Sequence, residues 1–233
     1  MAIDLRSFTA ARVGLERRGS SLSTKELLRF DLDHARARDA VHLELDPSSL
    51  GFDHILVQSE AKDRRSYLLR PDLGRRLQGK LQQNPCDAAI IVADGLSALA
   101  VHRHTKELIN RLLPLLEDWK LAPIIVATQA RVAIGDEIGE QLGAKLALVL
   151  IGERPGLTSP DSLGAYLTYN PRQGRNDAER NCVSNIRPEG LSYDAAAQLI
   201  HFLMTESRAR KISGVTLKSD ATPHPLLDAR PNP

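Results

Sequence analysis

Aromatic residues and cysteines are scarce in this chain of 233 residues. Phe, Trp and Tyr make up only 4% of the sequence, so Leu, Val, Ile and Ala must supply most of the core packing. The two cysteines, Cys86 and Cys182, lie far apart and form no Cys-x-x-Cys pair, which argues against a disulfide framework and a zinc site. None of the seven histidines has the His-Glu-x-x-His spacing of a metal-binding helix. The sequence therefore predicts no metal site.

A large excess of charge is also absent. Lys and Arg number 31 against 29 Asp and Glu, a net charge of +2. This balance gives no general reason to expect nucleic-acid or membrane binding. No apolar run is long enough to span a bilayer, and residues 1–7 lack the apolar core of a signal peptide. We therefore expect an intracellular protein with neither nucleic acid nor membrane as a partner.

Familiar catalytic and phosphate-binding motifs are missing. The chain contains no Gly-x-Gly-x-x-Gly after a strand and no Gly-x-x-x-x-Gly-Lys-Ser/Thr, the usual cradles for phosphates. Ser97 follows Gly95 but lacks the second glycine of a nucleophile elbow, so we interpret it as a helix cap. No arrangement of residues resembles an acid–base pair or an activated nucleophile. We predict no catalytic residue on this chain.

Buried-strand patterns alternate with helical patterns from residue 88 onward. Residues 88–93, 124–127 and 146–151 are short, unbroken apolar runs, typical of strands buried on both faces. Helical patterns separate them, and this succession predicts a parallel sheet with right-handed crossovers. The predicted fold class is thus α/β, a Rossmann-like parallel sheet with helices on both faces. A further strand at residues 164–169 and a helix from Ser192 to Gly214 complete it.

Three regions are predicted along the chain. Residues 1–45 form an N-terminal helical segment, in which Ser23 and Glu26 fit a capping box ahead of an apolar stripe. A helix with so little core of its own either exposes a solvated face or docks on another chain. Residues 46–218 form the Rossmann-like domain, with additional short strands at residues 55–57 and 67–69. The proline-rich residues 219–233 are predicted to be a disordered tail.

Polar loops follow the apolar strands. Glu153 and Arg154 come directly after the run at residues 146–151 and precede Pro155 and Gly156. Ligands of open parallel sheets bind beyond the carboxyl ends of the strands. Residues 181–190 form a second loop crowded with polar residues. From the residues alone, two ordinary surface loops and a binding site are equally good interpretations.

Several segments resemble the light (small) subunit of ethanolamine ammonia-lyase. They are "LIGERPGLTSPDSLGAYLTY", "AERNCVSNIRPEG", "RPDLGRRL", "ADGLSALAV" and "RVAIGDEIGEQLGAK", in the order of that family, and they span most of the chain from about Arg12 to Gly214. The resemblance implies an adenosylcobalamin-dependent lyase that converts ethanolamine to acetaldehyde and ammonia. It also implies a hetero-oligomer, in which a large subunit carries the catalytic site and the cofactor lies between the two subunits.

The resemblance further implies three cofactor-binding residues. The positions that match the family's cobalamin contacts are Val132, Glu153 and Cys182. Each also has an ordinary interpretation: Val132 as loop or core filler, Glu153 as a partner of a nearby arginine, and Cys182 as a small buried apolar residue. No histidine follows an aspartate by two positions, so the Asp-x-His-x-x-Gly motif by which many modules bind cobalt is absent. That absence is similar to this family, which keeps the nucleotide base on its cofactor.

The chain departs from the family in two places. It shows less sequence before the first helix than some members, in which an N-terminal extension helps direct the enzyme into a bacterial microcompartment. We therefore expect a bacterial cytoplasmic location, with encapsulation left open. The region at residues 174–178 is slightly shorter than in the family, near the loop that carries Cys182. The alternative function is a free-standing α/β module that binds a nucleotide-like metabolite or acts as a scaffold.

Overall fold

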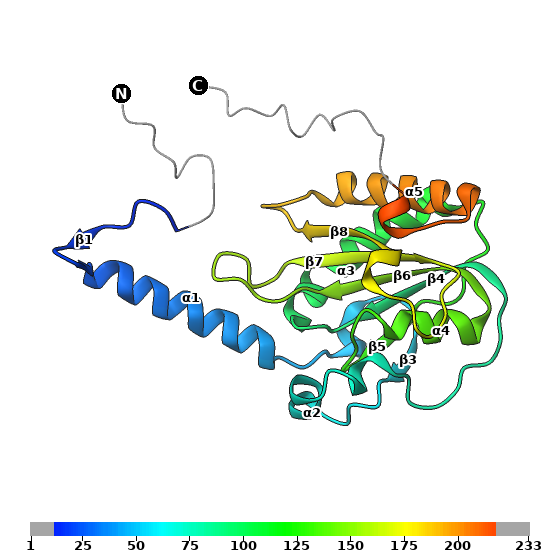
Figure 1. Cartoon of the computed structure of the whole chain (residues 1–233), viewed down its shortest axis with the longest axis horizontal. Helices are drawn as coiled ribbons and strands as arrows, with labels where there is room; N and C mark the ends of the chain where they lie inside the picture. Colours follow the sequence, from blue (N-terminus) through cyan, green and yellow to red (C-terminus); the bar gives the residue numbers. More distant parts are fainter. Residues whose placement is uncertain (1–11, 218–233) are drawn as a thin grey trace, which may run out of the picture.

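The computed structural model describes residues 12–217, whose centre is a six-stranded sheet (Figure 1). The strand order across the sheet is β3-β5-β4-β6-β7-β8. Their bounds are β3 Ile55–Gln58, β4 Cys86–Ala93, β5 Ile125–Thr128, β6 Ala144–Gly152, β7 Leu163–Tyr169 and β8 Arg180–Ile186. The α/β class and the three apolar strands predicted at residues 88–93, 124–127 and 146–151 are confirmed, as β4, β5 and β6.

The direction of the last two strands corrects the prediction of a parallel sheet. β3, β5, β4 and β6 run parallel, but β7 is antiparallel to β6, and β8 is antiparallel to β7. Only residues 153–162 join β6 to β7, and they contain no helix. A parallel return needs a crossover of a dozen or more residues, so this short connection brings the chain back antiparallel. The sheet is therefore mixed.

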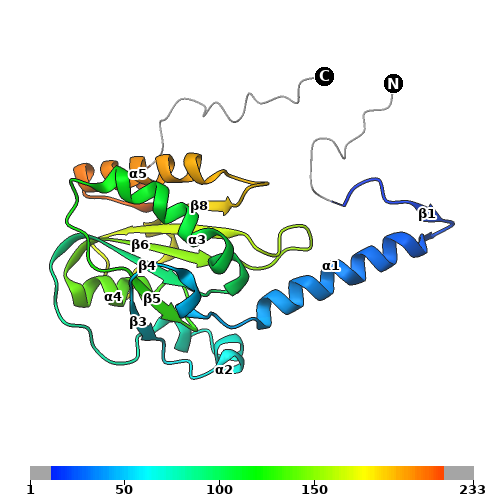
Figure 2. The same cartoon turned by 180° about the vertical axis from the view of Figure 1, so that it is seen from behind.

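Helices cover both faces of the sheet, as predicted. α3 (Ala98–Leu112) and α5 (Tyr193–Arg210) lie together on one face, and α4 (Ile134–Leu142) lies on the other (Figures 1 and 2). Successive residues of β4 point alternately to the two faces, so Ile90 packs in one apolar cluster and Ile91 in the other. Both residues are at most 1% exposed, which explains why the strand sequence is apolar without alternation.

Helix caps account for several boundaries. Ser97 and Ser192 accept hydrogen bonds from the backbone N–H groups of Ala100 and Ala195, which confirms both as caps of α3 and α5. The predicted end of the last helix at Gly214 is wrong, because α5 stops at Arg210 and Lys211 turns the backbone into the left-handed region (φ 59°). Short 3-10 helices lie at Pro47–Leu50, Leu73–Arg75, Leu113–Leu116, Asp177–Glu179 and Gly214–Thr216.

Residues 67–69 are helical and not a strand. They belong to α2 (Arg64–Leu69), whose first turn is capped by Asp63 through a 2.7 Å bond from the Ser66 N–H. This cap stabilises the helix start more strongly than three apolar residues in a row favour an extended chain. The helix places Tyr67 inward, where the side chain is 1% exposed.

The N-terminal part of the described chain forms an arm. Helix α1 (Thr24–His42) projects from the body on the same side as the β6–β7 loop, and a small hairpin, β1 (Arg17–Arg18) with β2 (Ser21–Leu22), precedes it (Figures 1 and 2). The hairpin replaces the continuous helix expected there, and residues 1–11 lie outside the described residues. Ala40 is the one buried residue of α1, whereas four large apolar side chains are exposed: Leu27, Leu28, Phe30 and Leu32. The predicted tail at residues 219–233 also lies outside the described part.

Candidate functional site

A cavity of about 220 Å³ opens at the carboxyl ends of the parallel strands. Residues from α2, from the ends of β4 and β6, from the loop after β5 and from β7 contribute to it. They are Tyr67, Gly95, Leu96, Arg131, Val132, Ile151, Gly152, Glu153, Arg154 and Tyr166. Two of the three predicted cofactor-binding residues, Val132 and Glu153, therefore share one pocket although 20 residues separate them.

Only one of the two carboxylate oxygens of Glu153 accepts hydrogen bonds from the described part of the protein. Its Oε2 accepts a short hydrogen bond from the Ser162 hydroxyl and a 3.4 Å bond from the Asn185 N–H. Oε1 accepts no hydrogen bond within residues 12–217. Gly164 lies against it, and a Cβ there would stand 2.8 Å from Oε1. The pairing of Glu153 with Arg154 considered from the sequence does not occur, so its charge remains available to a ligand.

Cys182 lies one strand away from the pocket. It is in β8, not in the predicted loop, and faces Tyr166 of β7 in the strand register. Tyr166 lines the pocket, so Cys182 borders it through this neighbour. Cys182 as a whole residue is exposed. The protein around its thiol nevertheless removes water from the group, and this desolvation raises the pKa of the thiol. The thiol is therefore neutral near pH 7 and suits apolar contact better than nucleophilic chemistry.

The loop that carries Val132 is fixed by a buried carboxylate. Asp94, at the end of β4, is fully buried and accepts 2.8 Å hydrogen bonds from the backbone N–H groups of Gln129 and Ala130. Gln129 has a φ of 53°, a left-handed conformation that is costly for a residue with a side chain. The two bonds from Asp94 compensate for that cost and set the direction in which the loop leaves β5.

Tyr67 and Arg131 are pocket residues that the sequence did not single out. The Arg131 guanidinium lies 4.5 Å from the centre of the Tyr67 ring, and its Nη2 donates to the Tyr67 carbonyl at 3.1 Å. The Arg131 backbone N–H donates to the carbonyl of Gly74 at 2.8 Å. The segment "RPDLGRRL", which carried part of the resemblance without a role, thus holds the Arg131 backbone through the Gly74 carbonyl, although none of its residues lines the cavity. Sequence patterns alone do not reveal the roles of Tyr67 and Arg131, because these roles depend on tertiary contacts.

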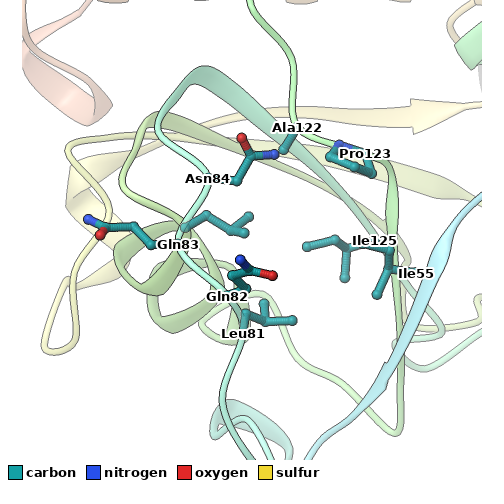
Figure 3. A pocket seen from close by; sticks show the side chains of 9 residues that line it. Ile55, Leu81, Gln82, Gln83, Asn84, Ala122, Pro123 and Ile125 are labelled. Atoms are coloured by element: carbon teal, nitrogen blue, oxygen red, sulfur yellow. The ribbon is translucent and has the colours of Figure 1, made fainter.

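A second cavity, of about 340 Å³, lies near the amino ends of β3 and β5 (Figure 3). Ile55, Leu81 and Ile125 contribute apolar side chains to it, beside the amide residues 82–84. No titratable side chain lines this cavity, whereas Glu153 and two arginines line the smaller one. Pockets that orient a ligand combine apolar walls with a few convergent polar groups. The carboxyl-edge pocket is therefore the better candidate site.

Two further observations concern metals and membranes. Within residues 12–217, no group of three or more His, Cys, Asp or Glu side chains is placed to hold a metal ion. The helices of this same part of the chain are too short or too polar to cross a bilayer. The candidate site consequently rests on the pocket residues described above.

Comparison with known proteins gives a consistent family. The family model described as "Ethanolamine ammonia-lyase light chain (EutC)" matches residues 2–218. A protein named ethanolamine ammonia-lyase small subunit from Pseudomonas fluorescens is 52% identical, over 94% of this chain and 86% of its own length. One of the same name from Bradyrhizobium diazoefficiens is 53% identical, over 94% of this chain and 90% of its own length. This chain belongs to the ethanolamine ammonia-lyase light-chain family.

Proposed function

We propose that this chain is the small subunit of an adenosylcobalamin-dependent ethanolamine ammonia-lyase, and that its carboxyl-edge pocket holds one side of the cofactor. Family membership supports the enzyme and the existence of a large-subunit partner. The observation that carries the site is Glu153, which lines the same pocket as Val132 and whose Oε1 accepts no hydrogen bond within the described residues. The parallel strands β3, β5, β4 and β6 form the Rossmann-like half of the sheet that presents this pocket.

The residues present fit such a cofactor. A corrin ring offers an apolar edge surrounded by carboxamide side chains, and the pocket offers the complementary groups. Glu153 would accept an amide N–H, while Val132 and the neutral thiol of Cys182 would supply small apolar contacts. When bound, the cofactor supplies the radical chemistry of carbon–nitrogen cleavage. This chain's residues bind and orient it and exclude water from its edge.

We assign the α1 arm to the large-subunit interface. The arm projects on the side of the β6–β7 loop (Figures 1 and 2). Glu153 and Arg154, at the start of that loop, line the pocket. Exposed apolar side chains that gather on one element commonly mark an interaction surface. Leu28, 64% exposed, and Leu32, 50% exposed, are four residues apart and so lie on one helix face. A large subunit that covers the cofactor would therefore also reach this face.

Reconstitution tests the proposed function. The chain, its large subunit and adenosylcobalamin should release ammonia from ethanolamine only when all three are present. Omission of each component in turn provides the controls. Robust ammonia release by this chain alone would contradict the proposal. Recovery of the chain from its native source without a larger partner would favour the free-standing module.

Replacing Glu153 by Gln tests the site. The change keeps the shape but removes the charge, and charge-assisted hydrogen bonds are worth roughly 1.5–3 kcal/mol, so cofactor affinity should fall about 10- to 100-fold. The melting temperature should change little. Glu140→Gln is a matched control, because Glu140 accepts a backbone N–H from Gln173 at 3.0 Å outside the pocket. Equilibrium dialysis of the assembled complex gives the affinities. A destabilised Glu153→Gln variant with wild-type affinity would make Glu153 structural.

Deletion of residues 1–38 tests the arm. The body should keep its melting temperature, because this part of α1 buries no residue and the deletion leaves Ala40 and the Val41 carbonyl, which accepts a 2.6 Å hydrogen bond from Arg64, in place. The affinity for the large subunit should fall at least tenfold. Size-exclusion chromatography and titration with the large subunit measure both effects. The double substitution Leu28→Ser with Leu32→Ser should reproduce most of the loss. Unchanged assembly of both variants would show that the arm is not an interface.

A further inference from the structure

The pocket contains an arginine with no counter-charge. Arg131 is half-buried, its Nε is buried without a hydrogen-bond partner, and no carboxylate lies within ion-pair distance of it among residues 12–217. Its protein contacts are the face of Tyr67 and two backbone groups. A cation held against an aromatic ring is only partly compensated for its lost hydration. A hydrogen-bond acceptor on a ligand would supply the partner that the Arg131 guanidinium lacks.

The neighbouring arginine is compensated differently. Arg64 lies 4.6 Å from the same Tyr67 ring, but its Nη1 is 3.6 Å from Asp94 and donates to the Gly95 carbonyl at 2.8 Å. Asp94 accepts hydrogen bonds from two backbone N–H groups of the loop after β5, and Arg64 is the arginine within ion-pair distance of it. Two guanidinium groups therefore lie over one ring, and of the two only Arg64 has a carboxylate of the described chain within ion-pair distance. The charge left over belongs to Arg131, which lines the cavity, whereas Arg64 does not.

An unpaired anion lines the same cavity. Glu153 makes no ion pair within the described residues, and its Oε1 accepts no hydrogen bond there. A carboxylate or phosphate ligand would satisfy Arg131 but would be repelled by Glu153. An ammonium ligand would have the reverse problem. A neutral group with both an acceptor and a donor suits both walls, and the primary carboxamide is such a group.

We infer that Arg131 and Glu153 form a two-sided site for primary carboxamides, in which Arg131 donates to a carbonyl oxygen and Glu153 accepts from an amide NH₂. The inference rests on the proposed function, because the proposed cofactor carries such amides around its ring. It adds Arg131 as a ligand-binding residue and Tyr67 as the ring against which its guanidinium packs. It also defines the chemistry that the pocket selects, neutral amides in preference to their acids.

Binding to the assembled complex with the large subunit tests the inference. Equilibrium dialysis with adenosylcobalamin should show affinity about 10- to 100-fold lower for Arg131→Met than for the wild type. Arg111→Met is the matched control, because Arg111 also lies over a tyrosine, 5.3 Å from the Tyr193 ring, but pairs with Asp194 outside the pocket. The control should bind within twofold of the wild type. Arg131→Gln keeps a hydrogen-bond donor but loses the charge, so its affinity for adenosylcobalamin should lie between those of the wild type and Arg131→Met.

A chemically altered ligand tests the selectivity. Cobalamins with one peripheral carboxamide hydrolysed to a carboxylate should include an isomer that binds at least tenfold more weakly than the parent to the wild type. Glu153→Gln should bind that isomer and the parent within threefold of each other, because the repulsion is removed. Equal binding of every isomer to the wild type would overturn the inference.

The remaining outcomes separate the two proposals. If the wild-type complex binds no cobalamin, the proposed function fails. If the wild type binds but Arg131→Met, with a melting temperature near that of the wild type, binds within twofold of it, the inference alone fails. Should Arg131→Met not fold, Arg131→Gln decides: wild-type affinity overturns the inference, and a loss of at least threefold supports it.

Discussion

Among residues 12–217, two pairs of buried aspartate and arginine residues can be compared, and they differ in how many of their polar atoms are hydrogen-bonded. Asp136 of α4 and Arg180 of β8 meet through two hydrogen bonds of 2.6 and 2.7 Å. Arg180 also donates to the Thr168 hydroxyl and to the Arg175 carbonyl, each at 3.0 Å. The pair joins a helix to the edge strand with its donors matched to acceptors, as a structural ion pair requires.

The second pair, Asp94 with Arg64, is geometrically incomplete. Its closest N–O separation is 3.6 Å, and Arg64 Nη2 is buried without a partner. Asp94 makes its 2.8 Å hydrogen bonds to Gln129 and Ala130 instead. Asp94 thus hydrogen-bonds the loop that lines the candidate pocket and does not form a close ion pair with Arg64. The following predictions test this distinction.

The largest effect is expected at the complete pair. Asp136→Asn leaves Arg180 charged and buried without its partner, which costs about 3–5 kcal/mol in the free energy of unfolding. Cofactor affinity of the folded, assembled protein should stay within twofold of the wild type. Urea denaturation and equilibrium dialysis give the two values. A loss below about 1 kcal/mol would mean that the pair contributes little to stability.

At the incomplete pair, Asp94 with Arg64, we expect a smaller loss of stability and a larger loss of cofactor affinity. Asp94→Asn removes one acceptor and the charge, so the free energy of unfolding should fall by about 1–3 kcal/mol. The loop that carries Arg131 and Val132 loses its anchor, and cofactor affinity should fall about tenfold or more. The same two measurements apply. Lost stability with unchanged affinity would place Asp94 among purely structural residues.

The smallest effect is a pH dependence. Burial, partly offset by the loop N–H groups and Arg64, raises the pKa of Asp94 from 3.8 to about 6. Between about pH 4 and pH 6 the folded state therefore binds this proton more readily than the unfolded state. The contribution of Asp94 to the free energy of unfolding falls as pH rises through that window, by at most about 1.4 kcal/mol per pH unit, and is constant above it.

Urea denaturation of the wild type and of Asp94→Asn across pH 4–7 isolates this contribution. Subtracting the two curves removes the carboxylates with lowered pKa, such as Asp161, whose contribution has the opposite slope. The difference should decrease with rising pH and flatten above about pH 6. A difference curve that rises with pH would contradict the assigned direction.

The sequence could predict the central strands because burial on both faces dictates composition. β4 and β6 carry unbroken apolar runs since each has a helix layer on either side. Strand direction is not encoded in that composition. Antiparallel β7 follows from the length and lack of helical pattern of residues 153–162, a feature that was visible in the sequence. For residues 67–69, Asp63 was the informative residue, because its capping bond decides for a helix.

The candidate site was predictable only in part. Glu153 was recognisable from its place after a strand and from a motif, and Val132 and Cys182 only from the resemblance. Asp94 and Arg131 were not, because their roles depend on tertiary contacts. Asp94 bonds to backbone groups 35 and 36 positions later, and Arg131 Nη2 bonds to a carbonyl 64 positions earlier. Short-range patterns carry no record of such pairs.

The α1 arm also has a consequence for how the cell makes this subunit. A copy without its partner presents Leu27, Leu28 and Leu32 to every protein it meets, and such surfaces promote aggregation. Within the described residues, the arm is anchored to the body only near its carboxyl end, by Ala40 and by the hydrogen bond from Arg64 to the Val41 carbonyl, so the rest of it is accessible to proteases. If the large subunit covers the arm, assembled copies are protected and surplus copies are degraded. The arm would then match the amounts of the two subunits without any dedicated regulator.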